Sequence, residues 1–180
     1  MRPVVGILFV AAVATFGDWL WFAIGMRNQA AMGSAHGALL LGSVGLVLGW
    51  LRGRVLPGLL TGIAAGVGGA LAYYALVAIG GRSVSLEAML AAWAAVWIVL
   101  AICDARILRR GSRPWSEALV RGLVAAVIGG VAFYGMYDYF WGERAVSVGD
   151  YLAHFAAWVV AWSPGVLALT AYTNRSTARA

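Results

Sequence analysis

Long apolar stretches separated by short polar connections make up almost all of this 180-residue chain. A helix needs about 20 mainly apolar residues to cross the hydrocarbon core of a bilayer. Six stretches reach or approach that length, at residues 3–24, 35–50, 56–79, 87–105, 118–141 and 151–169. The second is short, so we expect its helix to begin a turn earlier, near Ala31. The pattern predicts an all-α integral membrane protein with six transmembrane helices.

The hydrophobic pattern also repeats along the chain, which is the mark of a structural unit used more than once. At a constant shift, three positions of the middle third coincide with three of the last third: Gly62, Gly69 and Tyr74 with Gly122, Gly129 and Tyr134. A fainter match places Asp18, Trp21 and His36 on Asp138, Trp141 and His154. We therefore predict a single membrane domain over residues 1–180, built from three repeated helical hairpins at about 3–52, 56–105 and 116–172.

Glycines recur at a spacing of four within the predicted helices. Gly58, Gly62 and Gly66 share one helix face, and Gly45 and Gly49 do the same on the preceding helix. Small residues at this spacing let the backbones of two membrane helices approach closely. These faces are predicted to lie at helix–helix contacts in a compact bundle.

Composition supports the membrane interpretation. Hydrophobic residues make up 63% of the chain and charged residues 11%, against roughly 25% charged in a typical soluble domain. A soluble chain this short could not cover so much apolar surface. Cys103 is the only cysteine, so an intramolecular disulfide or a multi-cysteine metal site is excluded, and we interpret it as a small buried apolar residue.

The basic residues are distributed unevenly between the predicted loops. All thirteen are arginines, and most fall at the two termini and in alternate loops: Arg2, Arg52, Arg54, Arg106, Arg109, Arg110, Arg113, Arg121, Arg175 and Arg179. Only Arg27, Arg82 and Arg144 fall in the other loops. The positive-inside rule then places both termini in the cytoplasm of a bacterial-type inner membrane. The basic patches should face anionic lipid head groups rather than nucleic acid.

Four ionisable residues fall inside the predicted spans. Placing an ionisable side chain within a bilayer costs free energy, so the presence of each one calls for a structural or functional explanation. Asp18 and Asp138 lie near the non-cytoplasmic ends of the first and fifth helices, and His36 and His154 near the starts of the second and sixth. All four belong to one predicted layer. Carboxylate and imidazole together suit zinc, iron or copper, so this layer is a candidate metal site.

Other interpretations of this polar layer stay open. The carboxylates can orient imidazoles that hold a metal or haem iron, or the groups can form a proton relay, since His titrates near neutrality. Alternatively they lie among the lipid head groups, capping helices and pairing with Arg27 and Arg144.

Two tryptophans extend the candidate site along the sixth helix. His154, Trp158 and Trp162 are spaced four apart and therefore share one face. This face either lines a cavity for a cofactor or another small ligand, or packs against a neighbouring repeat.

No catalytic signature is present in the sequence, which points away from an enzyme. The first functional hypothesis is a membrane protein that binds a metal, haem or small ligand in the polar layer near the non-cytoplasmic face. The second is a small permease or the membrane component of a transporter. The third is a structural subunit of a larger membrane complex. The lipid bilayer is the expected partner in each case, with further membrane subunits or a second copy of the chain as additional partners.

Overall fold

The computed structural model describes residues 2–24, 28–81, 85–111, 113–140 and 148–171. Within these ranges, the side chains at 21–22, 85–86, 136–140 and 148 are not described. Trp21 and Asp138 are among them, so what the sequence predicts for these two side chains lies outside the described part of the molecule.

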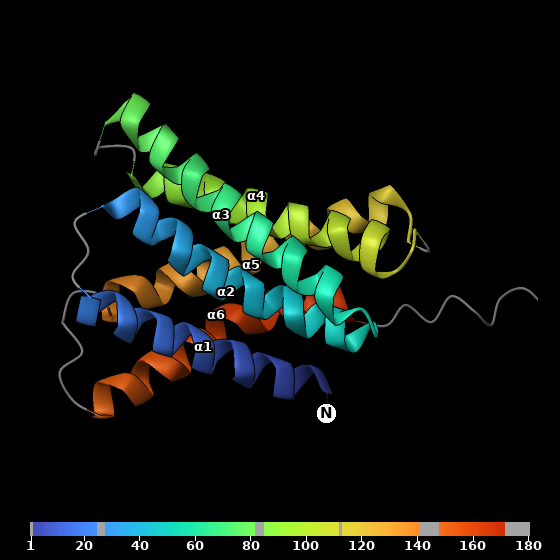
Figure 1. The fold of residues 1–180 in the computed structure, drawn as a ribbon, viewed down its shortest axis with the longest axis horizontal. Coiled ribbons are helices and arrows are strands. Elements are labelled where there is room, and N and C mark those ends of the chain that lie inside the picture. Colours follow the sequence, from blue (N-terminus) through green and yellow to red (C-terminus); the bar gives the residue numbers. More distant parts are fainter. Residues whose placement is uncertain (1, 25–27, 82–84, 112, 141–147, 172–180) are drawn as a thin grey trace, which may run out of the picture.

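Six long helices form the structure, as the sequence predicts. Their bounds are α1 (Arg2–Ile24), α2 (Gln29–Leu51), α3 (Val55–Gly80), α4 (Ser85–Cys103), α5 (Trp115–Phe140) and α6 (Val148–Thr170), with the short π-helix η2 (Asp104–Leu108) directly after α4. All six are long and apolar enough to cross a membrane. They run side by side along the long axis of the molecule (Figure 1).

Three helix boundaries differ from the predicted ones. Helix α2 begins at Gln29 rather than near Ala31, because the Asn28 side chain caps it by accepting a hydrogen bond from the Ala31 amide at 3.0 Å. The connection predicted at 106–117 is partly helical, since η2 continues the chain of α4 to Leu108 and α5 already begins at Trp115.

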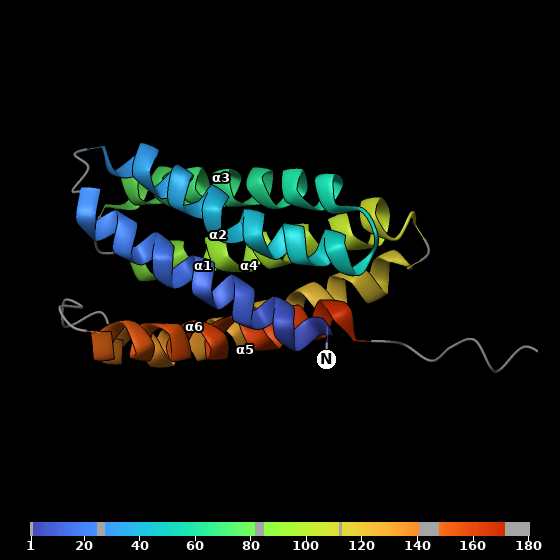
Figure 2. The same cartoon turned by 60° about the horizontal axis from the view of Figure 1, so that its bottom comes forward.

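The helices form a closed ring in chain order. Each helix packs against the next one along the chain, and α6 returns to pack against α1. Figure 2 shows α1 between the α2–α3 pair and the α5–α6 pair. The contact between α1 and α6 therefore brings together the first and last helices of the chain. The arrangement as three repeated hairpins stays a prediction.

The glycine faces lie between α2 and α3, which confirms the prediction of a helix–helix contact. A β-carbon added to Gly37 would lie 2.6 Å from the carbonyl oxygen of Gly66, and one added to Gly45 would lie 2.8 Å from the Gly62 α-carbon. Only glycine permits such an approach. This closest pair of helices joins the first predicted hairpin to the second, so the tightest packing lies between hairpins.

Candidate functional site

One carboxylate of the predicted polar layer contacts side chains from two other helices. Asp18 of α1 is 2% exposed. Its Oδ2 accepts a hydrogen bond of 2.6 Å from the indole Nε1 of Trp158 on α6. Its Oδ1 lies 3.4 Å from Nε2 of His36 on α2. Three predicted site residues, Asp18, His36 and Trp158, therefore meet where α1, α2 and α6 come together.

Local sequence explains how the His36 ring reaches α1. The preceding residue on α1, Gly17, has no side chain, and a β-carbon there would lie 3.3 Å from Cε1 of His36. The backbone of Gly17 also forms a hydrogen bond with His36. On α2, the early helix start at Gln29 places His36 two turns inside the helix rather than at its first turn. Gly17 thus makes room for the imidazole beside Asp18.

The two oxygens of Asp18 have different surroundings. The indole N–H of Trp158 satisfies Oδ2, whereas Oδ1 is buried and receives no hydrogen bond within the described part of the chain. A buried polar atom without a partner is rare and calls for a physical explanation. The imidazole of His36 is half-buried and is the nearest ionisable group in position to share a proton with Oδ1.

The remaining predicted residues of α6 lie on either side of Trp158. His154 is 5% exposed one turn before it, and Trp162 is fully buried one turn after it. The rings of Trp158 and Trp162 stack with centroids 5.6 Å apart. Trp162 also lies 5.2 Å from Trp93 and 5.8 Å from Trp97, centroid to centroid. Trp162 therefore belongs to an aromatic cluster between α4 and α6, while Trp158 joins that cluster to the Asp18 carboxylate.

The predicted metal site is not assembled within the part of the chain whose side chains are described. No group of three His, Cys, Asp or Glu residues there is positioned to hold a metal ion. The fourth predicted ligand, Asp138, lies outside the described side chains. The set of His36, His154, Asp18 and Asp138 as metal ligands, and haem as the alternative cofactor, stay predictions.

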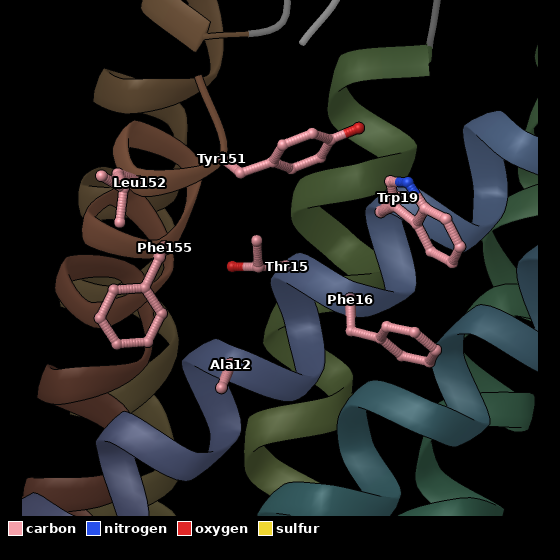
Figure 3. A pocket seen from close by; sticks show the side chains of 7 residues that line it. All are labelled: Ala12, Thr15, Phe16, Trp19, Tyr151, Leu152 and Phe155. Atoms are coloured by element: carbon pink, nitrogen blue, oxygen red, sulfur yellow. The ribbon is translucent and has the colours of Figure 1, made fainter. Parts of the chain in front are cut away.

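A groove of about 460 Å³ opens on the contact between α1 and α6, close to this site. Ala12, Thr15, Phe16 and Trp19 line it from α1, and Tyr151, Leu152 and Phe155 line it from α6. Figure 3 shows Thr15 pointing into the space between the two helices. Asp18 lies between Thr15 and Trp19 in sequence, so the groove runs beside the helix turn that carries the carboxylate.

A second polar centre, which the sequence analysis missed, lies at the opposite end of the bundle. Asp104 of η2 is fully buried. Its carboxylate oxygens lie 3.2 Å from Nε of Arg52, 2.8 Å from Nε of Arg109 and 3.5 Å from an Nη of Arg113. The same three arginines donate hydrogen bonds to the carbonyl oxygen of Leu169, near the carboxyl end of α6. We call these five residues the Asp104 network.

Glu117 and Arg121 of α5 extend the Asp104 network. The Glu117 carboxylate lies 3.3 Å from Nε of Arg113 and 3.0 Å from Nε of Arg121. Burial lowers the pKa of the Arg113 guanidinium to about 10, and repulsion from Arg109 and Arg121 adds to this shift. Burial also lowers the pKa of Arg52, against the attraction of Asp104. A pKa near 10 leaves Arg113 charged at neutral pH, so the network is ionic.

One sequence signal pointed to this network. Asp104 closes an apolar run and is followed by Arg109, five residues later. That spacing matches the π-helix, in which the Arg109 amide donates to the Asp104 carbonyl at 2.8 Å. An α-helical reading of the sequence places the two side chains on different faces, which hides their pairing.

Comparison with protein-family models, with curated proteins and with solved structures finds no match to this chain.

Proposed function

We propose that this chain is a small integral membrane protein that binds a proton at Asp18 and His36, as a small proton-coupled permease would. The observation that carries the proposal is the buried Oδ1 of Asp18, which has no hydrogen-bond donor among the described residues and lies 3.4 Å from Nε2 of His36. An ionisable residue enclosed within an apolar span is expensive to keep and is typical of proton and ion pathways.

A single proton shared by Asp18 and His36 can give the buried Oδ1 of Asp18 a hydrogen bond in either of two ways. A protonated Asp18 donates from Oδ1 to a neutral His36 ring, or a protonated His36 donates to an ionised Asp18. Both forms need only these two groups. Trp158 supports either form, since its N–H keeps the carboxylate oriented through Oδ2. His154 is a further titratable group on α6, one turn from Trp158.

A metal ion is the second candidate, and the burial of His154 favours it. His154 is 5% exposed on the helix that carries Trp158, so its imidazole lies inside the bundle, where an internal metal ion would need it. A metal site needs at least a third protein ligand, so this candidate requires His154 or Asp138 to join Asp18 and His36. The proton proposal requires no such addition.

The groove between α1 and α6 supports a role in permeation. Its lining is largely apolar, with the hydroxyls of Thr15 and Tyr151 and the indole N–H of Trp19 as its polar groups, which suits a small, mainly apolar molecule. The proposal assigns proton binding to Asp18 and His36 and substrate passage to the neighbouring groove.

Infrared difference spectroscopy of the purified protein at two pH values tests the proton site. We expect a pH-dependent Asp18 band, either the carbonyl band of the protonated acid or the carboxylate band of the ionised form beside a protonated His36. This band should disappear in Asp18→Asn and shift in Trp158→Phe, because Trp158 bonds the same carboxylate. Glu87→Gln is the matched control, since Glu87 is an exposed carboxylate in the first turn of α4. This control should keep the band. Identical spectra for Asp18→Asn and the parent would refute proton binding at Asp18.

Metal analysis of the same preparations separates the two candidates. A stoichiometric metal that is lost in both His36→Ala and His154→Ala would replace the proton proposal with the metal site. Loss of the infrared band in Asp18→Asn, with no stoichiometric metal in the parent, supports proton binding.

A further inference from the structure

Arg106 differs from the other arginines of η2 and the segment that follows it. The side chains of Arg109 and Arg113 pair with Asp104, whereas Arg106 makes no ion pair or hydrogen bond through its side chain with the described residues. Its Nε is buried and lacks an acceptor among them. A guanidinium carries five N–H donors in a planar fork and stays charged. Arg106 is therefore a cation with donors left to satisfy.

Trp115 holds this cation in place. The guanidinium carbon of Arg106 lies 4.0 Å from the centroid of the Trp115 ring, a cation–π contact. Trp115 is 53% exposed and begins α5. This contact restrains the guanidinium at the ring of Trp115, while its two Nη groups donate no hydrogen bond to the described residues and can bind an oxyanion. The position of Arg106 is thus set before any ligand arrives.

The local charge balance favours an anion. In the described residues of the segment 104–121, the acidic side chains are Asp104 and Glu117, and both are already shared among the arginines of the Asp104 network. Arg106 and the exposed Arg110 have no ion-pair partner there. A planar guanidinium matches phosphate oxygens with two parallel hydrogen bonds.

We propose that Arg106, stacked on Trp115, binds a phosphate group at this end of the bundle. The ligand class is a phosphate-bearing anion, supplied either by the head group of an anionic phospholipid or by free phosphate. The site lies at the end of the bundle opposite Asp18, so it is independent of the proton site. The proposed site differs from a diffuse attraction between basic loops and anionic lipid, because one residue, Arg106, binds the phosphate group.

Native mass spectrometry of the full chain in detergent tests the site, with phosphatidylglycerol and inorganic phosphate as separate probes. Arg106→Gln should weaken binding about 10-fold or more, as expected for the loss of a charge-assisted hydrogen bond. Arg110→Gln removes the same charge from the same segment and is the matched control. It should change the affinity by less than about threefold. Trp115→Phe should abolish any change in tryptophan fluorescence on binding and weaken the complex, with the bundle still folded.

The outcomes separate the two sources and the alternative. Saturable binding of phosphatidylglycerol that depends on Arg106, with little effect of inorganic phosphate, supports a lipid head-group site. The same dependence for inorganic phosphate, with no preference for the lipid, supports a site for free phosphate. Equal weakening by Arg106→Gln and Arg110→Gln would show diffuse attraction and overturn the proposal, as would the absence of saturable binding.

Discussion

Replacing Asp104 by Asn should destabilise the protein more than any other single change of charge in the Asp104 network. Asn has nearly the same shape, so packing is preserved while the negative charge is lost. Arg52, Arg109 and Arg113 would then stay together around a fully buried neutral side chain. Removing one partner of a buried ion pair costs about 3–5 kcal/mol, because the remaining charges stay buried without compensation.

The expected loss can be measured as the free energy of unfolding in detergent, followed by far-ultraviolet circular dichroism during denaturant titration. Glu117→Gln is the control. Glu117 is 20% exposed and its two arginine partners lie one helical turn away on either side. Because Glu117 keeps some contact with solvent, whereas Asp104 is fully buried, this variant should lose clearly less stability than Asp104→Asn.

A second substitution tests the cause. If the penalty comes from uncompensated positive charge, Arg113→Met in the Asp104→Asn background should recover part of the lost stability. The recovery appears as a coupling energy in a double-mutant cycle. Equal stability of Asp104→Asn and the parent would refute the reasoning. So would an equal loss in Glu117→Gln, because the cost would then not depend on burial.

Three further predictions concern packing and the candidate site. Gly66→Ala should lower the free energy of unfolding by about 1–3 kcal/mol, because its β-carbon would overlap the backbone of α2, whereas Gly68→Ala meets open space and should be neutral. Gly165→Ala should cost a similar amount by overlapping an indole ring of α4; both can be measured by denaturant titration. Trp158→Phe should cost about 1.5–3 kcal/mol through the lost hydrogen bond to Asp18, and Trp158→Phe in an Asp18→Asn background should cost clearly less.

The sequence predicts those parts of the fold that depend on local periodicity. Six helices follow from apolar stretches long enough to span a bilayer, and the glycine faces follow from the four-residue spacing of Gly58, Gly62 and Gly66. The identity of the opposing helix does not follow, because small residues show only that some backbone comes close. The structure pairs this face with α2 through Gly37 and Gly45.

The candidate site was predicted in part, for a related reason. Asp18 and His36 stand out because ionisable residues are rare in apolar spans, and their meeting across α1 and α2 agrees with that expectation. For Trp158, the sequence predicts only that it lines a cavity or packs against a neighbouring repeat. Its hydrogen bond to Asp18 depends on the rotation of α6 about its axis and on the packing of α6 against α1. The spacing of residues along a single helix predicts neither of these. Asp104 was missed because its pairing with Arg109 depends on π-helical geometry.

The Asp104 network and the Asp18 site contact opposite ends of α6 through different hydrogen bonds. This difference connects the fold to the proposed function. Near its carboxyl end, the carbonyl oxygen of Leu169 accepts hydrogen bonds from three arginines that also bind Asp104. Near its other end, Trp158 of α6 donates a hydrogen bond to the Asp18 carboxylate of α1. A proton on the Asp18 carboxylate weakens that oxygen as an acceptor, since hydrogen bonds to charged groups are stronger than those to neutral ones. Proton uptake would therefore loosen α6 from α1 beside the groove while the Asp104 network holds its other end, which is the asymmetry that a proton-controlled opening needs.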